Sequence, residues 1–491
     1  MTDLDRVIYL DYAATTPVDP AVAQAMASCL CVDGDFGNAA SATHVYGTRA
    51  AARIQRARAQ AAALVGATPE EIIFTSGATE SANLAILGVA RANADRGRHI
   101  VTSRIEHKAV LDSCKQLEKE GFSVTWLIPN RDGVIDPERV LSALRADTVL
   151  VTLMHANNEI GVIQDLAAVG SCCRERGVLF HSDAAQSVGK INADVGVLPV
   201  DFMSFTAHKI YGPKGVGALY VRRTRRGFLE PLLFGGGQER GLRPGTLATH
   251  QIVGFGEACE LAGQRCAAES ERLARMRELL WSRLSILGGV HVNGAGAPRL
   301  PGVLNVSFEG AEGESLVMGL PQLAVSTGSA CNSASGEPSY VLRALGRDSQ
   351  LAQSSVRFSL GRYTTEADIE AAAEAVVREV RRLRALSPTH PPPPGFSVSG
   401  EAGGPGEETW VRFDLAIENG IVKDARFKSY GCPHTLAVVS WLAAQLPGRR
   451  RDALVPGTPA DWAAIQSVPV EKLGRLLVVE DALQQCARHW A

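Results

Sequence analysis

Apolar runs alternate with helix-like stretches from about residue 70 to residue 220. Continuous apolar runs such as 149–154 predict strands that are buried on both faces. Strands that alternate with helices predict right-handed crossovers, with helices on both faces of a mainly parallel sheet. The pattern therefore predicts an α/β domain in this part of the chain.

The pattern changes after residue 250. A long helix with charges at i, i+4 spacing is expected over about 252–287. It leads to a smaller unit, with strands at 303–308 and 354–361 and an amphipathic helix over 366–386. Proline, then glycine, serine and glutamate, dominate from there to residue 408, which predicts a linker over 389–407 that is stiff at first and flexible beyond.

A third unit is expected over residues 408–491. Its start alternates apolar and polar residues, and one face carries Val411, Phe413, Leu415 and Ile417. A turn at residues 418–420 joins this run to a second one, so the pattern predicts a hairpin.

Candidate chemistry begins with a lysine in a tight loop. Lys209 lies between two apolar runs that predict short buried strands, and hydroxyl groups, a histidine and glycines surround it. A partly desolvated amine at the end of a sheet loses its proton easily and attacks carbonyl carbons. A surface lysine in a glycine-rich loop is the alternative, and the segment alone favours neither.

An upstream aspartate changes this balance. A hydrophobic strand is predicted to end at Asp183, and Gln186 follows three residues later. Alone, Asp183 is better explained as a helix N-cap after a strand. Together with Lys209 it matches what a pyridoxal phosphate site requires, because a carboxylate keeps the pyridine nitrogen protonated while a lysine carries the aldehyde.

The loop around Lys209 also resembles a known segment, Thr206-Ala207-His208-Lys209-Ile210-Tyr211-Gly212-Pro213-Lys214-Gly215. It is similar to the lysine segment of the cysteine desulfurases of the IscS/NifS type, which are class V aminotransferase-type pyridoxal phosphate enzymes of fold type I. The resemblance extends from about Ile8 to about Pro388. It implies a large domain over about 16–262 with a mainly parallel, seven-stranded sheet, and a small α+β domain over about 1–15 and 263–388. It also implies that L-cysteine is converted to L-alanine, with the sulfur left on the enzyme as a persulfide.

A hydroxyl-rich turn at residues 75–83 joins a predicted strand to a helix. Backbone N–H groups and the helix dipole form an anion pocket in such a turn. The resemblance makes it the cradle for the cofactor phosphate, with Ala78 and Thr79 as contacts. The remaining cofactor contacts that the resemblance implies are His107, Asn158, Asp183, Gln186, Thr206, His208, Lys209 and Thr246. Thr246 is expected to reach the phosphate bound by a second subunit, which implies a homodimer.

Small residues surround Cys331, which predicts an exposed loop. The family nucleophile stands in this loop, where a thiolate attacks the substrate sulfur and then carries a persulfide to a partner. The resemblance also places His107 on the pyridine ring as a proton relay. It places Asn38 near the substrate carboxylate and Arg357 against it; Asn158 is a further substrate contact.

Two positions depart from the family pattern. Ala39 follows Asn38 where the family usually has proline, and Asn332 follows Cys331 where it usually has threonine.

The third unit resembles the iron–sulfur scaffold proteins of the IscU type at residues 425–432 and 479–483. Those scaffolds build one site from three cysteines and an aspartate, whereas here only Cys432 stands at one of the cysteine positions and Arg475 stands about where the last cysteine belongs. One thiolate cannot hold a cluster alone. Our hypothesis is a degenerate scaffold domain that receives sulfur on Cys432 or regulates docking. No metal site is assigned; Cys331 is a candidate transient iron–sulfur ligand and Cys432 a candidate remnant ligand.

The overall composition limits the classes of partner that are expected. The 491 residues are 46% hydrophobic and 21% charged, with a net charge of −2, so bulk charge argues against nucleic acid. The sequence starts without an export signal, and no apolar run reaches membrane-span length. Ten cysteines in so long a chain make no disulfide framework, so reduced thiols in the cytoplasm are expected. The expected partners are L-cysteine and an iron–sulfur scaffold or another sulfur acceptor.

Two other functions stay open. A selenocysteine lyase or another class V aminotransferase would share the cofactor residues, but a transaminase does not need Cys331. The third unit could instead make the chain an assembly platform; this is disfavoured because no cofactor or nucleophile position is lost. The sequence does not decide which acceptor receives the sulfur.

Overall fold

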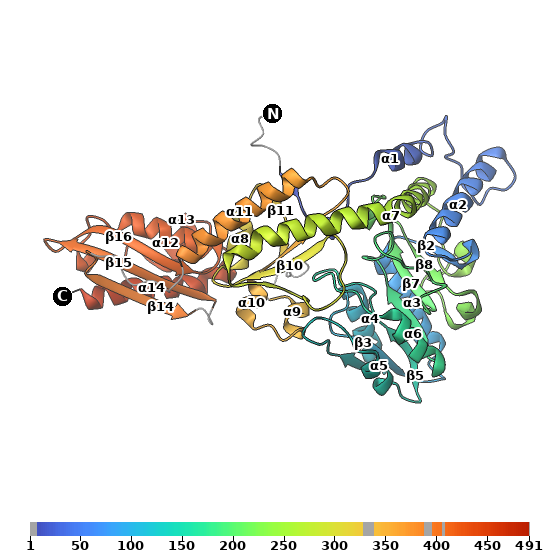
Figure 1. The fold of residues 1–491 in the computed structure, drawn as a ribbon, viewed down its shortest axis with the longest axis horizontal. Helices are drawn as coiled ribbons and strands as arrows, with labels where there is room; N and C mark the ends of the chain where they lie inside the picture. Colours follow the sequence, from blue (N-terminus) through green and yellow to red (C-terminus); the bar gives the residue numbers. More distant parts are fainter. Residues whose placement is uncertain (1–6, 328–337, 387–394, 405–407, 491) are drawn as a thin grey trace.

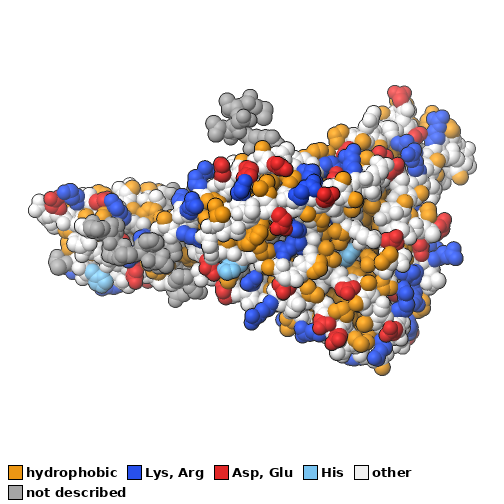
Figure 2. Space-filling view, in the orientation of Figure 1, with side chains coloured by type: hydrophobic (Ala, Val, Ile, Leu, Met, Phe, Trp, Pro, Cys, Tyr) orange, Lys and Arg blue, Asp and Glu red, His pale blue; other side chains and the backbone are white. Residues whose placement is uncertain are grey.

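The computed structural model describes residues 7–327, 338–386, 395–404 and 408–490. The molecule is elongated, with the large sheet at one end and the C-terminal unit at the other (Figure 1). Acidic and basic side chains are interspersed on the face shown in Figure 2. None of the described helices is long and apolar enough to cross a membrane.

Seven strands form the largest sheet, in the order β2-β8-β7-β6-β5-β3-β4. Their bounds are β2 Ile72–Thr75, β3 His99–Ser103, β4 Ser123–Leu127, β5 Thr148–Thr152, β6 Leu179–Asp183, β7 Phe202–Thr206 and β8 Gly217–Val221. Only the two pairs that involve β8 are antiparallel. The predicted seven-stranded, mainly parallel sheet is confirmed.

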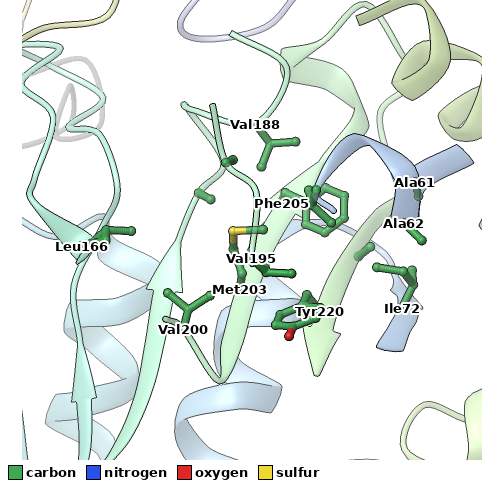
Figure 3. Packing of buried hydrophobic residues seen from close by; sticks show 14 of the residues in the cluster. Ala61, Ala62, Ile72, Leu166, Val188, Val195, Val200, Met203, Phe205 and Tyr220 are labelled. Atoms are coloured by element: carbon green, nitrogen blue, oxygen red, sulfur yellow. The ribbon is translucent and has the colours of Figure 1, made fainter. Parts of the chain in front are cut away.

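Apolar residues cover both faces of this sheet. Neighbouring residues of a strand enter two different cores. Phe180 of β6 and Met203 of β7 lie in the first core, and Leu179 of β6 and Phe202 of β7 lie in the second. Figure 3 shows the first core, where Met203 and Phe205 of β7 pack close to Tyr220 of β8. Burial on both faces explains why the strands read as continuous apolar runs. The helices of this part are α1 Pro20–Ala27, α2 Val45–Leu64, α3 Ala78–Ala92, α4 Lys108–Lys119, α5 Pro137–Ala143 and α6 Leu166–Glu175.

One glycine lets the end of β8 approach the turn before α3. A Cβ atom on Gly217 would lie 2.7 Å from the Cα atom of Gly77. Only a glycine therefore fits at position 217 without displacing backbone. The contact brings the hydroxyl-rich turn against the loop that contains Lys209.

The long helix α7, Thr249–Leu284, connects the large sheet to the smaller unit (Figure 1). The smaller unit has a four-stranded antiparallel sheet in the order β12-β13-β10-β9, and a parallel pair of β1 with β11. Its elements are β1 Ile8–Tyr9, β9 Val290–Val292, β10 Val303–Phe308, α8 Gly313–Met318, β11 Leu323–Ala324, β12 Ser326–Thr327, α9 Tyr340–Ala344, α10 Ser349–Gln353, β13 Ser355–Ser359 and α11 Glu366–Ala385.

The C-terminal unit packs three helices on a three-stranded antiparallel sheet, β14-β15-β16. Its elements are β14 Val398–Gly404, β15 Thr409–Glu418, β16 Ile421–Tyr430, α12 Pro433–Gln445, α13 Pro459–Ile465 and α14 Leu473–His489. β15 and β16 form the predicted hairpin.

The expectation of a linker that runs to residue 407 is wrong in its second half, because β14 lies there and pairs with β15 along its length. The glycines that suggested flexibility serve packing instead. A Cβ atom on Gly400 would lie 2.4 Å from the carbonyl oxygen of Ala482, so glycine allows α14 to lie directly on the strand.

Candidate active site

A cavity of about 630 Å³ lies at the carboxyl ends of the parallel strands. It gathers ten of the residues that the sequence predicted: Ala78, Thr79, His107, Asn158, Asp183, Gln186, Thr206, His208, Lys209 and Arg357. Ligands bind at this edge of α/β sheets because the loops after the strands converge there. The predicted residues come from α3, α4, β13 and the ends of β5, β6 and β7, so only the fold brings them together.

Lys209 ends a short 3₁₀ turn, Ala207–Lys209, that follows β7 directly. Its Nζ atom donates hydrogen bonds to the carbonyl oxygens of Ala13 (2.5 Å) and Ala14 (2.6 Å). These carbonyls follow β1, so the N-terminal segment holds the amine at the cavity.

His208 precedes the lysine and has little tendency to carry charge. Burial, together with the nearby charges of Lys209, Lys214 and Lys190, lowers the pKa of His208 to about 4. Its Nδ1 atom lies 3.2 Å from the hydroxyl of Thr15. A neutral imidazole at this place can donate or accept a hydrogen bond without opposing the positive charges around it.

Asp183 is 7% exposed at the end of β6. One of its carboxylate oxygens accepts the N–H of Ala185 at 2.9 Å. Burial raises the pKa of Asp183, while His107, the Ala185 N–H and Lys209 oppose that rise. A buried carboxylate in this setting favours a cationic partner inside the cavity.

His107 caps α4, and its Nδ1 atom accepts the N–H of Ala109 at 3.2 Å. In the neutral ring the proton is therefore assigned to Nε2.

A second buried carboxyl group lies beside Asp183, and no sequence pattern predicts it. Glu106 is fully buried, and Ser103 donates a hydrogen bond of 2.7 Å to it. Burial raises the pKa of Glu106 to about 8, with a further contribution from Asp183. Two neighbouring acids in one buried place do not both ionise easily, and a protonated Glu106 adds no second negative charge beside Asp183.

The stability of the protein is expected to depend on whether the carboxyl group of Glu106 is protonated. The folded chain keeps Glu106 protonated up to about pH 8, whereas an unfolded chain releases the proton near 4.5, so stability falls as the pH rises between these values. Relative to wild type, the free energy of unfolding of Glu106→Gln should therefore increase by about 4 kcal/mol between pH 5 and pH 9. The melting temperatures of both proteins at the two pH values measure the gain. Exposed Glu271→Gln is the control, and an equal difference at both pH values would contradict the prediction.

The turn before α3 can receive an anion. Gly77 caps α3 without a side-chain hydrogen bond, and the first N–H groups of any α-helix lack a partner within the helix. Glu80 also lines the cavity; it accepts the N–H of Ser76 at 2.7 Å and pairs with Arg243 at 3.0 Å, so a cation compensates its charge. The N–H groups of Ala78 and Thr79 therefore remain for a phosphate at the cavity.

Arg357 on β13 is held in place before any substrate arrives. It donates to the carbonyl oxygen of Asn158 and to a carboxylate oxygen of Asp11, both at 2.7 Å. Its buried Nε atom has no hydrogen-bond partner, and neither does the buried Oδ1 atom of Asn158. Such unsatisfied buried groups at a cavity can form hydrogen bonds with a polar ligand.

Cys331 lies outside the described residues. The described residues on both sides of it are anchored at the cavity. Ser326 and Thr327 line the cavity, and Ser339 donates a hydrogen bond of 2.5 Å to Glu159, which lines it as well. Burial raises the pKa of Glu159 to about 7.

Asn38 and Thr246 do not reach this cavity within one chain. Both line a separate cavity of about 280 Å³. Asn38 is exposed, and its Oδ1 atom accepts the N–H of Ala40 at 3.0 Å, as in an ordinary asparagine turn. Glu239 fixes the loop before Thr246 through a buried ion pair with Arg58 at 2.6 Å.

These residues fit pyridoxal phosphate. Lys209 can hold the aldehyde, the buried carboxylate of Asp183 suits a protonated ring nitrogen, and the turn before α3 suits the phosphate. The unsatisfied oxygen of Asn158 supplies an acceptor at the cavity wall.

Comparisons with known proteins agree with this geometry. The Aminotransferase class-V family matches residues 8–372. Cysteine desulfurase IscS of Pseudomonas aeruginosa is 59% identical over 381 residues, which are 78% of this chain and 94% of the relative. A solved NifS-like protein is 36% identical, with a TM-score of 0.71 over 77% of this chain and 100% of its own. SspA, solved in complex with cysteine, is 40% identical, with a TM-score of 0.66 over 73% of this chain and 99% of its own.

Sequence identity of this extent, a shared fold and a cavity that suits the cofactor lead to one assignment. The chain belongs to the class-V aminotransferase family of pyridoxal phosphate enzymes, as a cysteine desulfurase of the IscS/NifS type.

Proposed function

We propose that this enzyme transfers the sulfur of L-cysteine to Cys331 as a persulfide, releases L-alanine, and passes the sulfur on for iron–sulfur cluster assembly and to other acceptors. The observation that carries the proposal is one cavity lined by Lys209 and Asp183, at which the residues flanking Cys331 are anchored. Reduced thiols are needed for such transfer, which favours the cytoplasm.

The bound cofactor supplies an electron sink for the bonds at the substrate α-carbon. The buried carboxylate of Asp183 would keep the ring nitrogen of the cofactor protonated. Lys209 takes the α-proton and returns a proton later, and the Nε2–H of His107 is placed to relay another. Arg357, preset by Asp11, binds the α-carboxylate with two parallel hydrogen bonds.

The sulfur step balances without an external oxidant. The Cys331 thiolate attacks the substrate sulfur, an S–S bond forms, and the bond between that sulfur and the substrate β-carbon breaks. The electron pair of the broken bond stays with the carbon fragment, which takes up a proton at the β-carbon and leaves as alanine. An acceptor thiolate then attacks the outer sulfur of the persulfide, a new S–S bond forms on the acceptor, and the Cys331 thiolate leaves; release of this sulfur as sulfide takes two electrons from a thiol reductant.

A product assay tests the proposed reaction. Purified enzyme with pyridoxal phosphate, L-cysteine and a thiol reductant should form alanine and sulfide in equal amounts. A keto acid product that needs an amino acceptor would indicate a transaminase instead. Selenocysteine supplied at equal concentration decides the other alternative, since a selenocysteine lyase would prefer it strongly.

We also propose a homodimer with shared active sites. Several large apolar side chains are exposed in the two chain segments that contain or precede Asn38 and Thr246: Leu30, Val32, Phe36, Val45, Tyr46, Leu233 and Phe234. Exposed apolar side chains in such number are usual at an interface. A second copy seated there would let Thr246 serve a neighbouring site. A monomer in light scattering would contradict this arrangement.

We propose, finally, that the C-terminal unit over about 408–491 is a degenerate IscU-like domain. A linker precedes it. The desulfurase part covers residues 1–388 and is divided into the large and small domains given above. The C-terminal unit packs against α8 of the smaller unit. Ser315 donates a hydrogen bond of 2.8 Å to the carbonyl oxygen of Gly431, and Lys472 pairs with Glu314 at 3.0 Å.

Cys432 follows Gly431 at this contact and is fully buried. Its Sγ atom lies 3.4 Å from the hydroxyl of Thr435, and the guanidinium of Arg475 lies nearby. Sulfur can therefore reach Cys432 only when the contact opens. If Cys432 is an acceptor, Cys432→Ser should lower the amount of labelled sulfur found in the C-terminal unit after turnover with ³⁵S-cysteine. Equal labelling would leave the regulation of docking as its role.

A further inference from the structure

A second lysine lies behind the reactive one. Lys190 lines a small cavity together with Lys209, on the side of Tyr12, Tyr211 and Cys266. The side chain is half-buried, and its Nζ atom donates a hydrogen bond of 3.1 Å to the Oε1 atom of Gln186. Nothing in the predicted reaction uses this amine.

A short chain of hydrogen bonds connects the two amines. The Nε2 atom of Gln186 donates to the carbonyl oxygen of Ala13 at 2.8 Å. The same carbonyl accepts a hydrogen bond from Lys209 at 2.5 Å. An amide can rotate to exchange its oxygen and nitrogen, but the donor from Lys190 selects the orientation that presents Nε2 to Ala13. Lys190 therefore fixes Gln186, and Gln186 fixes the carbonyl that holds the reactive amine.

The charges around Lys190 are mostly positive. Burial, then the charges of Lys209 and Arg357, lower the pKa of Lys190 to about 7. Glu269 lines the same small cavity, but it pairs with Arg362 at 2.6 Å. Ser270 contacts only the backbone of Lys190, through its carbonyl oxygen at 2.7 Å.

The groups around Lys209 have opposing effects on the protonation of its amine. The two carbonyl groups that accept from its Nζ atom favour the ammonium form, which attacks no aldehyde. A second cation nearby favours the neutral amine, and a neighbouring cationic group is one established way to activate a lysine.

We propose that Lys190 is a positioning residue for Lys209: it fixes the amide of Gln186 and, through its own positive charge, increases the fraction of Lys209 that is deprotonated and reactive. The proposal rests on the proposed role of Lys209 as the residue that carries the cofactor aldehyde.

The test measures covalent attachment of pyridoxal phosphate to the cofactor-free protein as a function of pH, followed by absorbance. Lys190→Met should slow attachment about threefold to tenfold near pH 6.5 and move the pH midpoint upward, because the second charge is lost. Lys190→Arg keeps its charge at every pH. It should therefore have a midpoint at or below that of wild type, and the difference should be largest above pH 8, where the wild-type lysine is neutral.

A purely structural role predicts a different result, since both variants would then slow attachment at every pH without a shift of the midpoint. The proposal would be overturned by that uniform slowing, by an unchanged midpoint in Lys190→Met, or by midpoint shifts of the same sign in both variants. If Lys190→Met does not fold, the comparison of Lys190→Arg with wild type above pH 8 decides alone. Lys209→Ala separates the proposed function from the proposed role of Lys190. If pyridoxal phosphate still attaches to Lys209→Ala, the proposed function is wrong. If attachment is lost in Lys209→Ala but the Lys190 variants attach the cofactor as wild type does, only the role of Lys190 is wrong.

Discussion

Lys209→Ala is expected to lower the rate of alanine formation at least about 10⁴-fold and to leave the protein without covalently attached pyridoxal phosphate. In the proposed mechanism the amine has two roles that no neighbour can take over: it holds the aldehyde, and it moves the α-proton. Lys190 is bound to Gln186 and faces the small cavity behind, so it cannot replace the lost amine. The rate is measured as alanine formed from L-cysteine, and the attachment by absorbance and its loss after borohydride reduction.

A matched control separates this effect from general damage. Lys115 is exposed and pairs with Asp112 on the helix surface at 3.2 Å, so Lys115→Ala should keep both the rate and the attached cofactor. Alanine formation by Lys209→Ala within tenfold of wild type would refute the assignment of the reactive lysine.

Cys331→Ala is expected to abolish sulfide release with a thiol reductant, by at least about 10³-fold, while pyridoxal phosphate stays attached to Lys209. The physical reason is that the substrate sulfur must be attacked by a thiolate before its bond to carbon can break cheaply. Ser326 and Thr327 line the cavity before this residue, and Glu159 binds Ser339 after it, so both flanks are fixed at the cavity. Sulfide release and cofactor absorbance are measured on the same sample.

Cys31 is an exposed free cysteine outside this cavity, so Cys31→Ala should behave as wild type. Sulfide release that survives in Cys331→Ala would show that another group attacks the sulfur. Loss of both sulfide release and cofactor absorbance would instead indicate damage to the cofactor site. Only loss of sulfide release with a retained absorbance agrees with a nucleophile.

Local patterns predicted much of the fold because each pattern follows from burial alone. The strand that ends at Asp183 and the strands around Lys209 are buried on both faces, and such strands must be apolar throughout. The helix α7 was expected within three residues at each end. The error at β14 has an equally local cause, because glycines that allow a helix to lie on a strand look the same in sequence as glycines in a flexible linker.

The amino-acid sequence by itself determined the chemistry of the site: a lysine after one strand, an aspartate at the end of another and a hydroxyl-rich turn before a helix, each set by its neighbours along the chain. Tertiary structure decided which distant groups share one environment. Glu106 became a buried neighbour of Asp183, Asp11 became the partner of Arg357, and Asn38 and Thr246 were placed in another cavity. Burial and charge act through space over a few ångströms, and residues hundreds of positions apart come that close only after the chain has folded.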